Sequence, residues 1–207
     1  MKKIVLVLFL LAGFAAAGRA QESRQDVSIS GIGFIPPFVA SSTDVQVHSN
    51  SALGALASYR FMLTPNSAIE ANYGITYQNQ YNFVIGNSLR IPIQTRTQEI
   101  SGAFVRSFTF KKYNPFIEAG PTALIFLPIR NLGTGAQDAK QQTQVGVLYG
   151  GGIAYEVSPS FDIRAEYRAY ITKVPNFGLG SSNTTENLTT NKWFNIYVPT
   201  IGVAYHF

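Results

Sequence analysis

The sequence has no cysteine among its 207 residues, and it has only two histidines and one tryptophan. Without cysteine there is no disulfide framework, no thiolate zinc site and no cysteine nucleophile. Two histidines also argue against a multi-histidine metal site. Charged residues make up 13% of the chain, about half the usual share of a soluble domain, while aromatic residues reach 13%. This composition argues against disorder, and it gives no reason to expect a cofactor or a metal.

The first 20 residues have the pattern of a secretory signal peptide. Lys2 and Lys3 precede the apolar run Ile4–Phe14, and Gly18-Arg19-Ala20 supplies small residues where cleavage is expected. The run is too short for a spanning helix, which needs about 20 residues. Removing residues 1–20 lowers the formal charge from +5 to +2, because two lysines and one arginine leave. We therefore predict an exported domain over residues 21–207, without a nucleic-acid partner.

The most regular feature of the remaining chain is period-two alternation. Between Phe161 and Lys173, the odd positions are Phe, Ile, Ala, Tyr, Ala and Ile, and the even positions before Lys173 carry every charge. Residues two apart do not share a face of a helix, whereas they do in a strand. Seven further strands are predicted by the same test: Gln25–Ile35, Ser51–Leu63, Ala68–Gln78, Ile93–Phe108, Pro115–Leu127, Gln144–Glu156 and Lys192–Phe207.

The connections between these eight segments alternate between short and long. The short ones are Thr64–Ser67, Thr109–Asn114 and Val157–Ser160, and the long ones are Pro36–Asn50, Asn79–Pro92, Pro128–Gln142 and Val174–Asn191. Turn residues between consecutive strands predict an antiparallel meander. We expect bulges near Gly31, Pro121 and Pro199, because parity changes at the glycine and proline removes a ladder hydrogen bond.

Alternation alone leaves two orientations of the faces open. A soluble, lipocalin-like carrier would place the apolar face inside, whereas an outer-membrane barrel turns it toward lipid around a polar interior. The short and long connections favour the membrane, as does the chain's end on an alternating run. Aromatic residues near the strand ends favour it too, because such rings prefer the headgroup level. On the outward face we expect Tyr155, Phe161, Phe61, Tyr205 and Phe207 at one rim, and Tyr77, Trp193, Tyr81 and Phe126 at the other.

Two stretches carry a family resemblance. Gly202-Val203-Ala204-Tyr205-His206-Phe207 looks like the closing strand of small outer-membrane barrels. Residues 150–156 and 162–168 resemble the penultimate hairpin of the OmpA-type transmembrane domain and its opacity-protein relatives. The resemblance implies that the barrel-assembly machinery reads Tyr205 and Phe207, and that the role is structural, adhesive or stress-related. No peptidoglycan-binding domain is found, so cell-wall anchoring is not implied.

The inward face is expected to hold ion pairs. An eight-stranded barrel is just wide enough for side chains to fill it, and buried charges are tolerated when paired. Gly146, Gly150 and Gly152 would leave room for neighbouring arginines. The predicted lumen network consists of Arg60, Glu70, Glu118, Glu156, Asp162, Arg164, Glu166 and Arg168.

Catalysis has one weak candidate. Ser41, Ser42, Asp44, His48 and Ser49 share the first long connection, but a Ser-His-Asp site needs all three groups within mutual reach. We predict no enzyme and no catalytic, metal or cofactor residues.

The sequence thus predicts an all-β, eight-stranded, antiparallel up-and-down barrel in the bacterial outer membrane. Its lumen is expected to be filled by side chains, and four long connections would face the cell surface. Its expected partners are membrane lipid, the assembly machinery and an unidentified surface ligand. Two alternatives stay open: a narrow OmpW-like conduit for small or apolar solutes, and a loop-borne lipid or peptide hydrolase.

Overall fold

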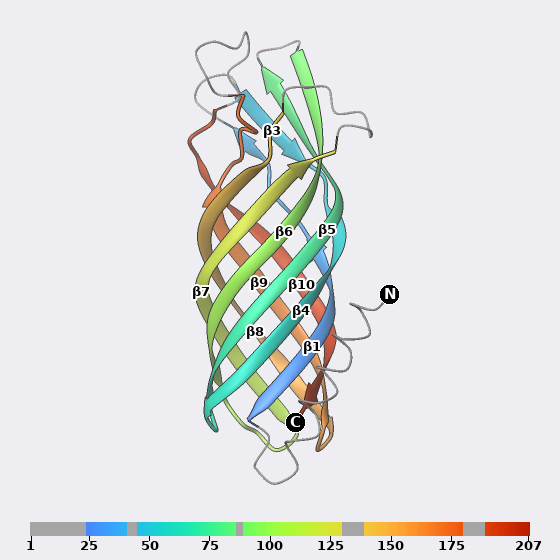
Figure 1. Cartoon of the computed structure of the whole chain (residues 1–207), viewed down its shortest axis with the longest axis vertical. Helices are drawn as coiled ribbons and strands as arrows, with labels where there is room; N and C mark the ends of the chain where they lie inside the picture. The colour runs from blue at the N-terminus through green and yellow to red at the C-terminus, as the bar shows by residue number, and fades with distance from the viewer. Residues whose placement is uncertain (1–23, 41–44, 86–88, 130–138, 180–188) are drawn as a thin grey trace, which may run out of the picture.

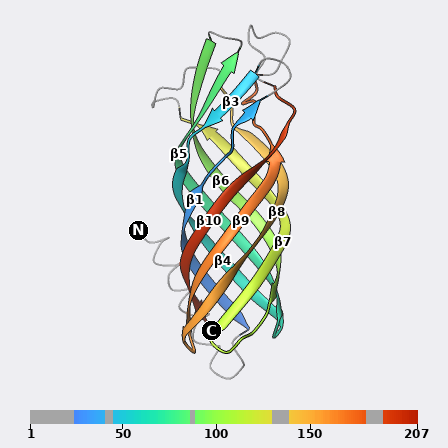
Figure 2. The same ribbon diagram turned by 180° about the vertical axis from the view of Figure 1, so that it is seen from behind.

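Ten antiparallel strands form the protein in a computed structural model, which describes residues 24–40, 45–85, 89–129, 139–179 and 189–207. The barrel strands are β1 (Gln25–Phe34), β4 (Ala52–Thr64), β5 (Ser67–Ile85), β6 (Leu89–Ser107), β7 (Tyr113–Pro128), β8 (Gln142–Ser158), β9 (Phe161–Lys173) and β10 (Trp193–His206). Each pairs with its neighbour in sequence, and β1 closes the barrel against β10 (Figures 1 and 2). The predicted eight-stranded barrel is confirmed. Among the described residues, no helix is long and apolar enough to cross a membrane.

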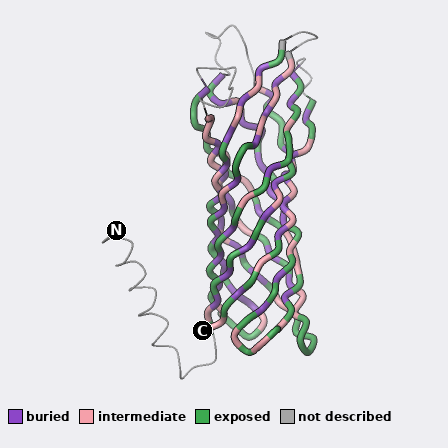
Figure 3. The backbone as a smooth tube through the Cα atoms, turned by 90° about the vertical axis from the view of Figure 1, so that its right-hand side faces the viewer, coloured by how far each residue is buried: buried purple, intermediate pink, exposed green. Residues whose placement is uncertain are grey.

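Buried and exposed residues alternate along the strands (Figure 3). In β9, Asp162, Arg164 and Arg168 are buried, whereas Phe161, Ile163 and Tyr167 are exposed. Charged side chains therefore point toward the barrel axis and apolar ones point outward.

The two barrel ends differ in their connections. Short connections follow β4, β6 and β8 at the end that holds the C-terminus (Figure 1). At the opposite end, the first long connection contains two strands that the sequence did not reveal, β2 (Val39–Ala40) and β3 (Val45–Ser49). Strand β3 pairs with residues 81–85 of β5. The second predicted long connection is mostly strand as well, because β5 and β6 stay paired up to Ile85 and Leu89.

The three predicted bulge positions are wrong. The register of β1 with both neighbours is unbroken at Gly31. Pro121 and Pro199 each leave a gap in a ladder, but the register is the same on both sides of each gap. The register shifts occur instead at Met62/Thr64, Thr76/Asn79 and Glu156/Ser158. The second of these contains Gln78, whose φ of 59° lies in the left-handed region.

Candidate functional site: the barrel lumen

Ion pairs occupy the half of the lumen nearer the C-terminal end of the barrel. Arg60 on β4 lies opposite Glu70 on β5, with 2.6 Å between Arg60 Nη2 and Glu70 Oε2. The Arg60 guanidinium also lies 4.9 Å from the centre of the Phe116 ring. Both charged side chains are almost fully buried, so each depends on the other for compensation.

Arg168 joins three strands across the axis. Its Nη2 lies 3.1 Å from Glu99 Oε1 on β6, and its Nε lies 3.1 Å from Glu118 Oε1 on β7. The Tyr170 hydroxyl donates a hydrogen bond to the other oxygen of Glu99. The Arg168 side chain is 0% exposed, so water cannot replace either carboxylate.

A second set lies toward the chain's end. Arg164 Nη2 is 2.8 Å from Asp26 Oδ2 on β1, and both side chains are buried. His206 Nε2 lies 2.8 Å from Asp162 Oδ2, and its Nδ1 lies 3.9 Å from Asp26 Oδ2. Strands β1, β9 and β10 are therefore joined by polar side chains inside the barrel as well as by the backbone ladders of its wall.

All eight residues predicted for the lumen network lie on the inward face. Five of them make ion pairs, and Asp162 lies against the His206 ring. Glu156 and Glu166 are only partly buried, and no described Lys, Arg or His nitrogen lies within 4.0 Å of either carboxylate. Sequence reasoning missed two acidic partners of the arginines, Asp26 and Glu99. Each stands among inward serines or threonines on its strand, and that spacing was the available signal.

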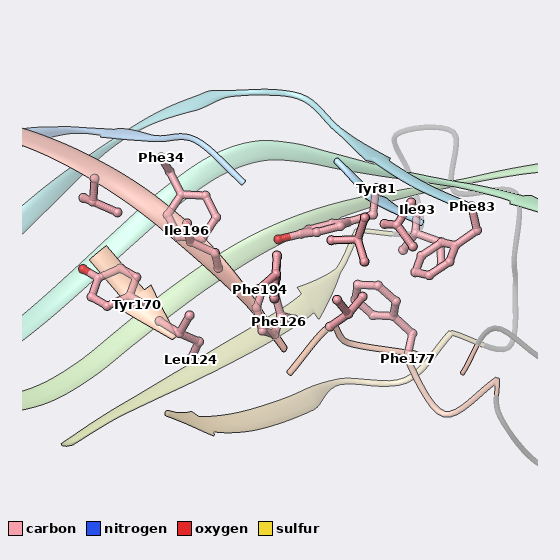
Figure 4. Packing of buried hydrophobic residues seen from close by; sticks show 14 of the residues in the cluster. Phe34, Tyr81, Phe83, Ile93, Leu124, Phe126, Tyr170, Phe177, Phe194 and Ile196 are labelled. Atoms are coloured by element: carbon pink, nitrogen blue, oxygen red, sulfur yellow. The ribbon is translucent and has the colours of Figure 1, made fainter. Parts of the chain in front are cut away.

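The other half of the lumen is filled mainly by apolar side chains, although Asn79, Thr95 and Thr172 are buried there too. We call the following buried residues the outer cluster: Phe34, Tyr81, Phe83, Ile93, Leu124, Phe126, Phe177, Phe194 and Ile196 (Figure 4). Phe177 follows β9 and lies 5.9 Å from Tyr81, 6.1 Å from Phe83 and 6.4 Å from Phe126, measured between ring centres. The backbone N–H groups of Asn176 and Phe177 both donate to Gln142 Oε1, which fixes this segment over the lumen.

The predicted outward aromatics divide into two groups. Tyr77, Tyr155, Phe161 and Trp193 are exposed on the outer surface. Tyr77 lies under the Arg96 guanidinium and Trp193 beside the Lys173 ammonium group, at 5.1 and 5.6 Å. Tyr81 and Phe126 were assigned to the wrong face, since both are 0% exposed in the outer cluster. For Tyr81 the reason is the bulge at Gln78, which reverses the parity of β5.

The loop hydrolase receives no support from the described residues. His48 lies on β3 opposite Asn82, and its ring packs against Phe38 at 4.5 Å. Ser49 follows it on the same strand, while Ser41, Ser42 and Asp44 lie outside the described residues. No group of His, Cys, Asp or Glu within the described ranges could hold a metal ion.

The comparison with protein families decides what kind of barrel this is. A family model described as an outer membrane protein beta-barrel domain matches residues 5–207. The chain belongs to this family. It is therefore a protein of the bacterial outer membrane, and the apolar outer surface of the barrel faces lipid.

Solved structures agree with the fold of this outer-membrane barrel. Neisserial surface protein A is 15% identical, with a TM-score of 0.60 over 89% of this chain and 98% of its own. OprG from Pseudomonas aeruginosa is 10% identical, with a TM-score of 0.63 over 90% of this chain and 97% of its own. Among curated proteins, no sequence matches the chain significantly.

Gly150 provides a test of how tightly the lumen of this outer-membrane barrel is packed. A Cβ at Gly150 would lie 2.8 Å from the Tyr167 carbonyl oxygen and 3.1 Å from Glu118 Oε1. We expect Gly150→Ala to lower the free energy of unfolding by about 1–3 kcal/mol, as overpacking does. Gly102→Ala is the control, because its Cβ would lie 3.9 Å from the nearest atom. Equal urea midpoints for the two variants would contradict the close packing at Gly150.

Proposed function

We propose that the protein is a non-enzymatic outer-membrane barrel that presents its four long connections at the cell surface. Its lumen is closed by side chains and conducts no bulk solution. The observation that carries this proposal is that the arginines across the axis are buried. Arg60, Arg164 and Arg168 are at most 3% exposed, so water does not reach them along the axis. The outer cluster covers them on the other side.

The orientation follows from the connections. Outer-membrane barrels have short periplasmic turns and longer external loops, so the end that bears β2 and β3 faces outward. Binding sites are often found on loops held by a rigid scaffold, which supports an adhesive or structural role with a surface ligand. The narrow conduit is the weaker alternative, because side chains occupy both halves of the lumen.

A planar-bilayer recording of the purified protein tests the closed lumen. We expect no steady, large conductance steps, in contrast to an open porin recorded in the same bilayer as a positive control. Steady large steps from the wild-type protein would contradict the proposal.

Several further assignments belong to the same proposal. Residues 1–20, outside the described residues, act as the cleaved signal peptide, and residues 21–207 form the mature barrel. Tyr205 and Phe207 form the signal read by the barrel-assembly machinery. Tyr77, Tyr155, Phe161 and Trp193 lie at the headgroup levels, which is supported by their exposure and by the cations beside Tyr77 and Trp193.

The assembly signal has its own test. Phe207→Ala removes a ring that stacks on Tyr205 at 6.1 Å but leaves the barrel wall intact. We expect less folded protein in the outer membrane and an unchanged urea midpoint for the fraction that folds. Val203→Ala, on the outward face of the same strand, is the control. Equal membrane yields for the two variants would refute the assignment.

A further inference from the structure

The barrel wall contains a pocket where β1 meets β10. Its volume is about 450 Å³, and residues from both faces of the sheet line it. Gly31, Gly33, Leu53 and Ile201 come from the outward face, and Glu166 and Thr200 come from the lumen face. The pocket therefore extends from the lipid-facing surface to a lumen carboxylate.

The pocket exists because two residue types meet in the ladder. Ile35 and Tyr197 exchange both backbone hydrogen bonds, and the same register places Gly33 opposite Pro199 two residues further on. That pair occupies a hydrogen-bonded position of the ladder, but proline has no N–H to donate. The Gly33 carbonyl thus lacks its ladder donor. Glycines at positions 31 and 33 add no side chains to the outer surface there, where the Pro199 ring lies beside Gly33 and also lines the pocket.

Glu166 is the polar group at the inner end of the pocket. It is only partly buried, and no described Lys, Arg or His nitrogen lies within 4.0 Å of its carboxylate. The inward arginines are too few to pair with every inward carboxylate, so none is left for Glu166. In the described residues, three inward arginines face seven inward carboxylates: Asp26, Glu70, Glu99, Glu118, Glu156, Asp162 and Glu166. This part of the lumen therefore favours the binding of a positively charged ligand.

We propose that the wall pocket binds a free single-chain amphiphile with a protonated amine as its headgroup. The ammonium group donates hydrogen bonds to the Glu166 carboxylate and the Gly33 carbonyl, which are both acceptors. The alkyl chain lies against Leu53 and Ile201, which are 79% and 64% exposed on the outer surface. The volume falls within the range of about 300–1,000 Å³ that is usual for small-molecule sites. A fatty acid of the same length would bring a second anion to Glu166, so repulsion would weaken its binding.

The test uses the folded protein in phosphatidylcholine nanodiscs, with dodecylammonium and dodecanoate as probes. Backbone amide NMR signals of Gly31, Gly33 and Gly54, which line the pocket, report binding. We expect saturable shifts with dodecylammonium and at least about tenfold weaker binding of dodecanoate. Equal binding of the two probes, or shifts that grow without saturation, would overturn the proposal.

Two variants separate the headgroup from the chain. Glu166→Gln should weaken dodecylammonium binding about tenfold or more, since a charged hydrogen bond is lost. Glu156→Gln is the matched control, because that carboxylate is also inward and without an ion pair but does not line the pocket. Gly31→Leu should block the chain while leaving Glu166 in place, because a Cβ there has 4.0 Å to its nearest neighbour. An unchanged affinity in either the Glu166 or the Gly31 variant would refute the site.

The source of the amine is also distinguishable. Nanodiscs with phosphatidylethanolamine present the same ammonium group on a two-chain lipid. We expect the glycine signals to shift only after dodecylammonium is added. Shifts caused by phosphatidylethanolamine alone would overturn the assignment to a free ligand.

Discussion

Replacing Arg168 with leucine is expected to lower the free energy of unfolding by about 3–5 kcal/mol, the usual cost of breaking a buried ion pair. The substitution leaves Glu99 and Glu118 inside the barrel without their shared guanidinium group. Urea unfolding of the refolded protein, followed by the heat-modified gel shift, measures the change.

The control for this prediction lies on the same strand. Lys173 is exposed on the outward face of β9 beside Trp193, so Lys173→Leu should change the midpoint little. A triple variant, Arg168→Leu with Glu99→Gln and Glu118→Gln, should recover part of the lost free energy of unfolding because the unpaired carboxylates are removed. If the Arg168→Leu midpoint equals that of the wild type, Arg168 is not the buried partner of these carboxylates.

Placing a charge on the lipid-facing surface should lower the free energy of unfolding by a similar amount. Ala165 is exposed on the outward face of β9, between Phe161 at one rim and Lys173 at the other. We expect Ala165→Arg to cost about 2–4 kcal/mol in a bilayer, as arginine does near the midplane of such barrels. Unfolding titrations in phosphatidylcholine vesicles measure this cost.

The control for this prediction is a substitution on the same outward face of β9 but at the end of the strand. Lys173→Arg keeps a cation at the rim, where the cost falls to about 0–1 kcal/mol. If Ala165→Arg is as stable as Lys173→Arg, the outward face of β9 does not lie in the hydrocarbon layer.

The strands were predictable because the two faces of this sheet differ so strongly in chemistry. In β9 every charge before Lys173 falls on one face, so the strand and its division into a charged and an apolar face follow from parity. The same rule fails for Tyr81, because one left-handed residue, Gln78, shifts the register of β5. The run Gln78-Asn79-Gln80 contains no glycine or proline that would have predicted this bulge.

The sequence predicts which residues face the lumen, but it does not predict which of them pair with one another. Parity places Arg168 and Glu118 inside, whereas the pairing of Arg168 with Glu99 depends on how four strands, β6 to β9, are staggered around the axis. Arg164 and Asp26 are 138 residues apart and meet only because β1 closes the barrel through β10. The outer cluster was missed because an apolar residue on the inward face breaks the expected alternation of polar and apolar faces. The sequence does not show that one half of the lumen holds ion pairs and the other half holds mainly apolar side chains.

Single cysteine labels test the central claim, which is that the apolar face meets lipid and the polar face meets the axis. The chain has no cysteine of its own, so a spin label can be attached at one position at a time on β4. Ala55 and Ala57 are exposed, whereas Leu56 and Ser58 are buried. In a bilayer we predict high collision rates with oxygen for labels at Ala55 and Ala57, and low rates for labels at Leu56 and Ser58. The reverse order, or equal rates at all four positions, would contradict the account.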